Sequence, residues 1–314
     1  MNDVPIGLVF PGQGTQRQGM GEPWRDTPSW ALVARMSEAV GEDLEELLLW
    51  TSAERLRRTD LAQLAVFTVS SVAHAEAVRR GVLDPGPVAC AGHSLGEYTA
   101  LACAGVLTPL DAAALVAARG RAMRTAAEAL PGTMYALVGA PLDEVAELTR
   151  QVRESVGDAW IANVNAPGQT VVSGSPQAMA AIAERSRSIG AKAIALQTGG
   201  AFHSPYMARA AEELRIALKN AEFTDGRLPV VAGVDATAYA GDADWPELAV
   251  RQLTSPVLWQ RCVATLTGPL GCRRLVEIGP GKTLAGLIRR IAPDVEVWAV
   301  DGPAALDALP GARP

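Results

Sequence analysis

A serine between two glycines is the residue best suited to chemistry in this sequence. Ser94 stands in Gly92-His93-Ser94-Leu95-Gly96, after a short apolar run at 87–91 and before a helix-like segment at 97–105. Glycines let a strand turn abruptly into a helix without Cβ clashes, so that a serine at the turn is exposed. The helix N-terminus would face an oxyanion formed there. The pattern predicts a nucleophilic serine, and the alternative is an ordinary strand-to-helix turn.

A serine hydroxyl is a weak nucleophile unless a base takes its proton, and the sequence holds three histidines. His74 lies within a helix-like segment beside alanines. His93 adjoins Ser94, and consecutive side chains of an extended strand point to opposite faces. His203 follows in a glycine-rich loop at 199–205, where a side chain can reach over a cleft. By elimination His203 is predicted as the base. No aspartate stands out as a third member, and a backbone carbonyl could orient the base instead.

The elements that must position these residues follow from apolar spacing. A buried strand is expected at 6–10, leading into Pro11-Gly12-Gln13-Gly14, and helices are expected at 30–49 and 61–80. The order strand, helix, strand, strand, helix, strand is expected at 134–139, 142–154, 159–164, 170–174, 176–189 and 192–197. That order is typical of a ferredoxin-like unit.

Strands of the first kind are expected again at 228–233 and 274–278, so the ferredoxin-like unit interrupts a longer α/β pattern. The predicted architecture is a catalytic lobe of residues 1–130 and 200–314, with a subdomain of residues 131–199 inserted. The active site is expected in the cleft between them. The last fifteen or so residues, rich in Ala, Pro and Gly, are expected to be a poorly ordered tail.

Composition narrows the class of function. The chain has 314 residues, 49% of them hydrophobic, and a net charge of −6, which provides no positive field for nucleic acid. The four cysteines lack metal-ligand spacing and fit buried free thiols of a reducing cytoplasm. We find no signal-like N-terminus and no segment near the ~20 apolar residues of a membrane span. A cytoplasmic protein without a metal or a membrane partner is expected.

Four motifs together resemble the malonyl-CoA:acyl carrier protein transacylase family. They are Pro11-Gly12-Gln13-Gly14, Gly92-His93-Ser94-Leu95-Gly96-Glu97-Tyr98, Ala201-Phe202-His203-Ser204 and Glu277-Ile278-Gly279-Pro280-Gly281. They occur in the family's order and span nearly the whole chain. The resemblance implies an α/β-hydrolase-like large lobe with a parallel sheet and an inserted ferredoxin-like subdomain, similar to the pattern above.

The resemblance also implies catalytic roles. Ser94 would form an acyl-enzyme ester, and the backbone N–H groups of Gln13 and Leu95 would bind the oxyanion. In the family a main-chain carbonyl beside a glutamine orients the histidine, and the segment around Gln252 is similar to that one. A ping-pong reaction with His203 as base and then acid is expected.

Four residues are implied in substrate binding. Arg119 occupies the position of the family's carboxylate-binding arginine, and a guanidinium can hold a carboxylate bidentately. Gln63 aligns with a glutamine near that arginine, and Phe202 resembles the malonyl-preferring form of the histidine loop. Tyr135 stands where the family more often has a small residue, and Gly233 replaces a frequent asparagine, so both departures bear on acyl preference.

The partners implied are an acyl-CoA as substrate and an acidic acyl carrier protein, with no further cofactor. An acidic carrier needs a basic surface, for which the candidates are Arg153, Lys192, Arg289 and Arg290. Each alone could be an ordinary solvated charge.

Three other functions are compatible with parts of the pattern. The same ester could be resolved by water in an editing hydrolase, although such an enzyme has no need to bind a carboxylate through Arg119. Carrier-to-carrier transfer of a longer or aminoacylated chain is left open by Tyr135. A non-catalytic carrier-binding scaffold would be expected to lose Ser94 or His203, and both are present.

Overall fold

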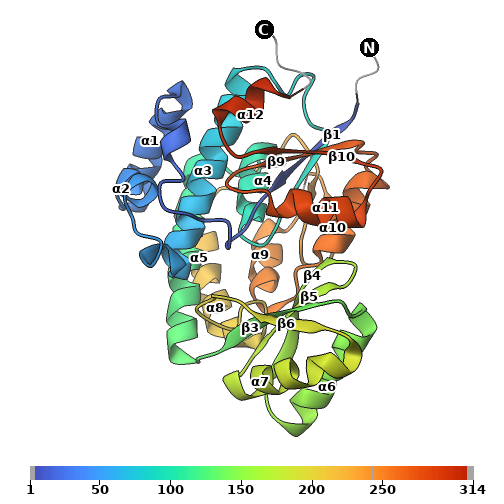
Figure 1. The fold of residues 1–314 in the computed structure, drawn as a ribbon. Helices are drawn as coiled ribbons and strands as arrows, with labels where there is room; N and C mark the ends of the chain where they lie inside the picture. The colour runs from blue at the N-terminus through green and yellow to red at the C-terminus, as the bar shows by residue number, and fades with distance from the viewer. Residues whose placement is uncertain (1–3, 242, 310–314) are drawn as a thin grey trace.

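The computed structural model describes residues 4–241 and 243–309, and places their strands in two separate sheets (Figure 1). The six-stranded sheet has the order β10-β9-β1-β2-β7-β8, and all its neighbouring strands are parallel except β7 and β8. Its strands are β1 Ile6–Phe10, β2 Ala89–Gly92, β7 Val230–Val231, β8 Ala238–Tyr239, β9 Arg274–Ile278 and β10 Glu296–Val300. The strand expected at 228–233 is thus reduced to two residues.

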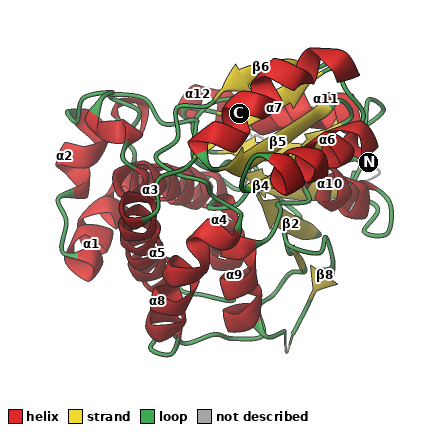
Figure 2. Cartoon of the chain, turned by 90° about the horizontal axis from the view of Figure 1, so that it is seen from below, coloured by secondary structure: helices red, strands yellow, loops and turns green. Residues whose placement is uncertain are grey.

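Helices cover both faces of this sheet, which is why the residues of β1 are apolar without alternation. Leu8 and Phe10 pack with helices on one face, and Val9 packs with helices on the other. The helices outside the small sheet are α1 Ala31–Val40, α2 Leu44–Leu49, α3 Thr59–Arg79, α4 Gly96–Ala104, α5 Pro109–Ala129, α8 Ala208–Leu218, α9 Trp245–Thr254, α10 Trp259–Thr267, α11 Thr283–Ile291 and α12 Pro303–Asp307. Figure 2 shows α3, α5, α8 and α9 grouped beside the strands.

Short 3-10 turns connect several of these elements. They lie at Glu22–Trp24, Pro28–Trp30, Arg55–Arg57, Ser186–Ile189 and Pro205–Met207. The six-stranded sheet, its helices and the turns outside residues 133–195 are called the large lobe below.

Helix α3 is more apolar than the sequence analysis allowed. The helix has 21 residues, and an 18-residue stretch within it has a mean hydropathy of 1.3, so by length and composition alone it could cross a membrane. The expectation that no segment approaches such a length was therefore wrong. Within the described residues, 78% of that apolar stretch is buried, and α3 packs against α5. Burial in the core accounts for its composition.

The helix expected at 30–49 is interrupted. Gly41 has φ 71°, a left-handed conformation that favours glycine, and it ends α1. Asp43 then caps α2, because its side chain accepts a hydrogen bond from the Glu46 amide. The apolar spacing continues across the break, which is why spacing alone missed it.

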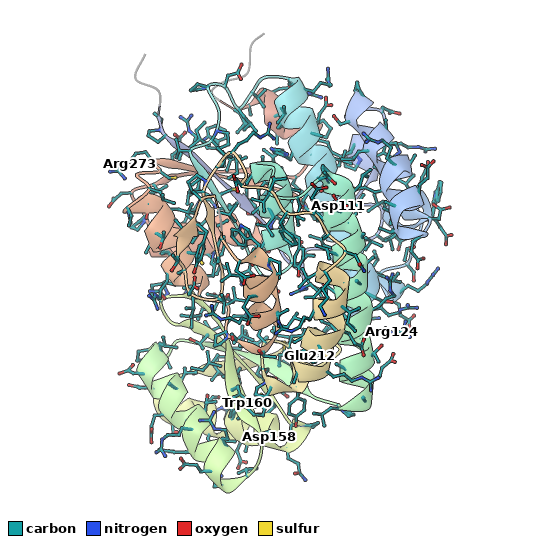
Figure 3. The ribbon with its side chains drawn as sticks, turned by 180° about the vertical axis from the view of Figure 1, so that it is seen from behind. Asp111, Arg124, Asp158, Trp160, Glu212 and Arg273 are labelled. Atoms are coloured by element: carbon teal, nitrogen blue, oxygen red, sulfur yellow. The ribbon has the colours of Figure 1, made fainter. Side chains whose placement is uncertain are left out.

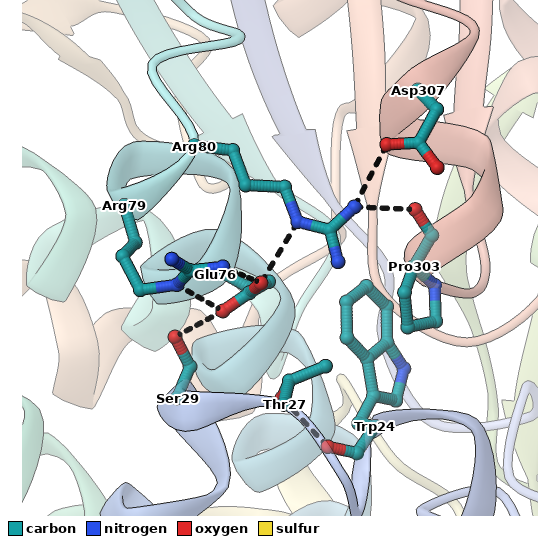
Figure 4. Close-up of polar contacts among 8 residues, drawn as sticks. All are labelled: Trp24, Thr27, Ser29, Glu76, Arg79, Arg80, Pro303 and Asp307. Carbon is teal, nitrogen blue, oxygen red and sulfur yellow. Dashed lines mark hydrogen bonds and ion pairs between the residues drawn. The ribbon is translucent and has the colours of Figure 1, made fainter.

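The C-terminal segment is more ordered than expected within the described residues. Leu306 of α12 is fully buried. Arg80 of α3 donates to the Pro303 carbonyl and the Asp307 carboxylate, and also to Glu76, which Arg79 holds from the other side (Figure 4). The predicted tail is thus wrong for α12, and residues 310–314 lie outside the described residues.

The four-stranded sheet, called the small lobe with its helices, comprises residues 133–195. Its order is β4-β5-β3-β6, all antiparallel, with strands β3 Thr133–Val138, β4 Ala159–Ala166, β5 Gln169–Gly174 and β6 Lys192–Ala195. Helices α6 Leu142–Ser155 and α7 Pro176–Arg185 pack on one face. This is the ferredoxin-like arrangement. The predicted fold class is confirmed, and the exact boundaries at 131 and 199 stay a prediction.

Contacts at Val257 and Tyr206 are among those that join the small lobe to the large one. Val257 exchanges backbone hydrogen bonds of 2.9 Å with Ala162 and Val164 of β4. At the start of β4, labelled in Figure 3 by Asp158 and Trp160, the Tyr206 hydroxyl donates to Asp158 at 3.2 Å and its ring packs edge-on against Trp160. These contacts hold the segments that follow the histidine and the carbonyl described next.

Candidate active site

The turn between β2 and α4 places Ser94 in a strained conformation. Ser94 has φ 51°, which is unusual for a residue other than glycine. A Cβ on Gly92 would overlap the backbone of Gly96, and one on Gly96 would overlap the Phe10 carbonyl. Both glycines are therefore needed for β2 to pass directly into the helix. The predicted strand, sharp turn and helix are all present.

The structure brings Ser94 and His203 together. The serine Oγ lies 2.8 Å from His203 Nε2, and His203 Nδ1 lies 2.9 Å from the backbone carbonyl of Gln252. A carbonyl only accepts hydrogen bonds, so Nδ1 carries the proton and Nε2 is free to accept the serine proton. The carbonyl thus occupies the place of an aspartate in a triad.

His203 is neutral at neutral pH. Burial lowers the pKa of His203 to about 3, and the positive charge of Arg119 adds to that effect. A neutral imidazole can accept a proton, whereas an imidazolium cannot. The environment therefore keeps His203 in the form that a general base requires.

Arg119 of α5 is a buried cation, with 1% of its surface exposed. Its Nη2 donates to Ser94 Oγ and to the Gln252 side chain, both at 3.0 Å, and its Nη1 donates to Gln63 Oε1. Its Nε has no hydrogen-bond partner within the described residues. None of its side-chain partners is a carboxylate. Burying an unpaired charge is costly, so this arrangement favours an anionic ligand.

A cavity of about 620 Å³ joins these groups. Gln13, Ser94, Leu95, Arg119 and His203 all line it. The backbone N–H groups of Gln13 and Leu95 donate to no other group in the part of the chain that the structure describes. Two free amide donors beside a serine are the elements of an oxyanion hole.

Phe202, Gln63 and Tyr135 are placed differently from one another. Phe202 lines the cavity, as expected for a residue that limits the acyl group. Gln63 is buried behind Arg119 and holds it, with its amide N–H donating to Thr59 at 2.9 Å. Tyr135 packs on the α6 and α7 side of β3, because neighbouring side chains alternate and Met134 faces the cavity. Tyr135 is thus not among the residues that line the cavity, and its contact with substrate stays a prediction.

Sequence reasoning missed several residues of the site. His93 lines the same cavity as Ser94, and its Nε2 lies 2.8 Å from Asn165 Oδ1. The argument from strand alternation failed because Ser94 is not extended. Asn163 also lines the cavity, and Arg57 lies exposed at its edge. No motif in the sequence distinguished Asn163 or Arg57, and His93 was quoted within the serine motif but set aside.

Glu97 was quoted in a motif without a role. It is fully buried, and its carboxylate accepts from the Gly233 amide at 2.6 Å. Burial raises the pKa of Glu97 to about 7, although the bonds from Gly233 and Gln252 act against this. Glu97 thus supports the side chain of Gln252, which in turn binds Arg119 and donates to the Ser94 carbonyl at 3.2 Å.

The predicted basic residues do not form a single cluster. Arg290 donates to Pro167 and Gln169 at the turn between β4 and β5, and Gln169 lines the cavity. Lys192 lies at the same end of the sheet, because it pairs with Val138, which pairs with Gln169. Arg153 donates to Ala159, whose partner Gly174 lies at the opposite end of β5. The structure therefore separates Arg153 from Lys192 and Arg290.

Arg289 has a different environment from its neighbour Arg290. Its Nη2 donates to the Val297 carbonyl of β10 at 3.4 Å. It is exposed on α11 and lies away from the residues that line the cavity. Within residues 4–241 and 243–309, no group of three or more His, Cys, Asp or Glu side chains is arranged to hold a metal ion.

Comparison with known proteins places this geometry among acyl transferases. Residues 8–297 match the model of the acyl transferase domain. The malonyl CoA-acyl carrier protein transacylase of Bacillus subtilis is 36% identical over 305 residues, covering 96% of this chain and 95% of the relative. The protein of the same name from Mycobacterium tuberculosis is 37% identical over 305 residues, covering 97% and 99%.

Solved structures agree over the same length. The MCAT of Mycobacterium tuberculosis superposes with a TM-score of 0.91 at 36% identity, covering 97% of this chain and 99% of that one. A type II PKS acyl-carrier protein in complex with its malonyl-transacylase gives a TM-score of 0.90 at 33% identity, again covering 97% and 99%. The similarity thus includes both lobes.

Proposed function

The chain belongs to the acyl transferase domain family and is an acyltransferase, and from this membership we propose that it moves a malonyl group from coenzyme A to an acyl carrier protein. One observation carries the proposal: the Ser94 oxygen lies 2.8 Å from His203 Nε2 and 3.0 Å from Arg119 Nη2. A nucleophile, a base and a carboxylate-binding group meet at one atom. The relative's name and the carrier-protein complex support the two substrates.

In the first half-reaction His203 takes the Ser94 proton while the serine oxygen attacks the thioester carbonyl of malonyl-CoA. The negative charge that develops on the carbonyl oxygen is stabilised by the N–H groups of Gln13 and Leu95, each worth roughly 3–4 kcal/mol of barrier. The intermediate collapses, the carbon–sulfur bond breaks, and protonated His203 returns the proton to the coenzyme A sulfur. Ser94 is left as a malonyl ester.

In the second half-reaction the phosphopantetheine thiol of the carrier protein takes the place of coenzyme A. His203 removes the thiol proton, the sulfur attacks the ester, and the proton returns to Ser94. The chain's own groups supply the base and the oxyanion donors, so we propose that no metal or organic cofactor is required. The free buried cysteines fit the cytoplasmic location proposed for this reaction.

Arg119 directs the proposal towards dicarboxylic acyl groups. Gln63 and Gln252 hold its guanidinium group, and its Nη2 also contacts the Ser94 oxygen. The carboxylate of a malonyl group lies two bonds beyond the reacting carbonyl carbon, so it would be within reach of this guanidinium group. Phe202 on the cavity wall leaves less room for a branch beside that carbonyl. An editing hydrolase has no use for this buried cation, which is why transfer is the better proposal.

Intact-mass spectrometry after mixing the protein with malonyl-CoA tests the proposed ester. A single malonyl adduct that maps to Ser94 and disappears on adding carrier protein is expected. An active preparation that never carries the adduct would contradict the mechanism. Loss of the adduct to water at the same rate with or without carrier protein would instead support the hydrolase.

We further propose that Lys192 and Arg290 help to dock the carrier protein, since both lie at the end of the small sheet beside the cavity. Lys192→Glu together with Arg290→Glu should slow transfer to the carrier about tenfold at low salt, with malonyl-CoA loading unchanged. Arg153→Glu, at the other end of the sheet, is the matched control. Equal effects of both changes would contradict this docking surface.

A further inference from the structure

A second nucleophile–histidine pair lies at the far end of α4. Cys103, in the last turn of the helix, has its Sγ 3.2 Å from His74 Nε2 of α3. Ser94 precedes the first turn of the same helix, so the two pairs are separated by roughly 13 Å along its axis. The proposed acyl transfer does not use Cys103 or His74.

This pair faces a cavity of its own. Cys103 and His74 line a cavity of about 680 Å³ between α3, the end of α4, the start of α5 and the segment before β7. Cys103 is 7% exposed and His74 is half-buried, so a small molecule in the cavity can reach the sulfur. None of the other three cysteines lines this cavity.

The charged groups around Cys103 favour a thiolate. His74 contacts it from α3, and Arg227 lines the cavity from the segment before β7, stacked over Gly105. Asp111 of α5, which Figure 3 labels, and Glu222 lie further along the wall. Interaction with the neighbouring Cys90 thiol, together with His74 and Arg227 and against the effect of burial, lowers the pKa of Cys103 to about 5.

Cys90 of β2 is a second thiol behind the first. Its Sγ donates to the Ala100 carbonyl, one turn before Cys103, at 3.4 Å, and it is fully buried. Its pKa lies above its ordinary value, first through its interaction with Cys103 and then through burial. Cys90 is therefore a protonated thiol that contacts α4 one turn before Cys103.

We propose that Cys103 is a reactive thiolate that is oxidised by small hydroperoxides, and that Cys90 is the thiol that resolves the oxidised form. The Cys103 sulfur attacks the terminal oxygen of the hydroperoxide, the O–O bond breaks, and the His74 imidazolium gives its proton to the departing alkoxide. Sulfur is oxidised to a sulfenic acid, and the hydroperoxide is reduced to an alcohol or to water.

In the second step the Cys90 sulfur attacks the sulfenic sulfur of Cys103. The S–O bond breaks, the Cys90 proton joins the departing hydroxide as water, and a disulfide joins β2 to α4. These are the two elements on either side of the Ser94 turn. A cellular dithiol would reverse the reaction by exchange.

Iodoacetamide labelling of the full chain at about pH 6, read by peptide mass spectrometry, tests the thiolate. We expect Cys103 to react at least about tenfold faster than Cys272, whose pKa burial raises to about 11. His74→Asn should slow Cys103 about tenfold and leave Cys272 unchanged. Equal rates for the two cysteines, or no effect of His74→Asn, would overturn the proposal.

Two further measurements keep the test decisive if His74→Asn folds poorly. Arg227 is exposed, so Arg227→Gln is expected to fold and to slow Cys103 labelling by a smaller factor.

Treatment with hydrogen peroxide should remove two hydrogens and join the Cys90 and Cys103 peptides. In Cys90→Ala the sulfenic acid should persist and react with dimedone. Sulfinic acid at Cys103 in the unaltered chain, or no oxidation, would overturn the role of Cys90.

Discussion

The two ends of α4 each place a nucleophile beside an imidazole. The shared proton lies on the nucleophile in the Ser94–His203 pair and on the imidazole in the Cys103–His74 pair. At the N-terminal end, Ser94 Oγ and His203 Nε2 are 2.8 Å apart, and burial with the charge of Arg119 lowers the pKa of His203 to about 3. At the C-terminal end, Cys103 and His74 are 3.2 Å apart. There burial also lowers the pKa of His74, but the charge of Cys103 outweighs it and the net shift is upward.

The groups around each histidine, rather than the imidazole itself, determine the chemistry of the two pairs. A cation beside His203 and a neutral hydroxyl as its partner leave a base that takes up and returns a proton in each half-reaction. An acidic thiol beside His74 leaves a thiolate that needs no base to react. The first pair is suited to reversible acyl transfer and the second to reaction with electrophiles.

The largest effect should separate the two nucleophiles. Ser94→Ala removes the atom that accepts the acyl group, so malonyl loading should fall by about 10³-fold or more. Cys103→Ala should change loading by less than about threefold, because Cys103 lies outside the active-site cavity. Loading rates from malonyl-CoA in rapid-quench experiments compare the two variants. Loading that survives in Ser94→Ala and fails in Cys103→Ala would reverse the assignment.

Arg119→Ala tests the cation that distinguishes the two pairs. Malonyl loading should fall about 100-fold, because the lost charge-assisted hydrogen bonds are worth about 1.5–3 kcal/mol. Acetyl loading should hold or rise, since acetyl has no carboxylate. Arg124→Ala is the matched control: Arg124 lies on the same helix but is only half-buried and pairs with Asp60 and Glu128. An equal loss for both acyl groups would exclude carboxylate recognition by Arg119.

What could be predicted from the sequence was local. The turn at Ser94 depends on glycines one turn apart, and strand β9 has the predicted bounds because its apolar run is short and continuous. The break at Gly41 was missed because the apolar spacing continued across it. The side of β3 on which Tyr135 packs was not predicted, because resemblance gives a position in the chain and not the face of the strand.

Contacts between distant segments were the part that spacing could not reveal. His74 meets Cys103 across 29 residues, and the Gln252 side chain meets Arg119 across 133, without a motif at either end. His203 was found because the sequence has only three histidines, which made elimination possible, and because its loop resembles a family motif. The numerous acidic residues allowed no such elimination, so the role of Glu97 emerged from the structure alone.

Gln252→Ala should have a smaller effect than Arg119→Ala. The change keeps the backbone carbonyl that holds His203 and removes the side-chain bonds to Arg119 and to the Ser94 carbonyl. The lost bond to the Ser94 carbonyl is neutral and the one to Arg119 is charge-assisted, but Gln63 still holds Arg119, so a net loss of about 2 kcal/mol should lower malonyl loading about 30-fold, with kcat affected more than KM. Gln151→Ala, an exposed glutamine of α6, is the control. A loss as large as that of Ser94→Ala would mean that the side chain also holds the carbonyl in place.

The smallest expected effect is that of pH on the Ser94 pair. A histidine of ordinary pKa near 6.5 would lose about 30-fold of its neutral form between pH 7 and pH 5. With the pKa of His203 at about 3, loading should change less than about threefold over that range and fall only as the pH approaches the folded value. The measurement is kcat/KM for malonyl-CoA, with an acid limb near pH 6.5 as the contradicting outcome. Because Arg119 contributes to lowering this pKa, the acid limb for acetyl loading should move to higher pH in Arg119→Ala and stay in place in Arg124→Ala.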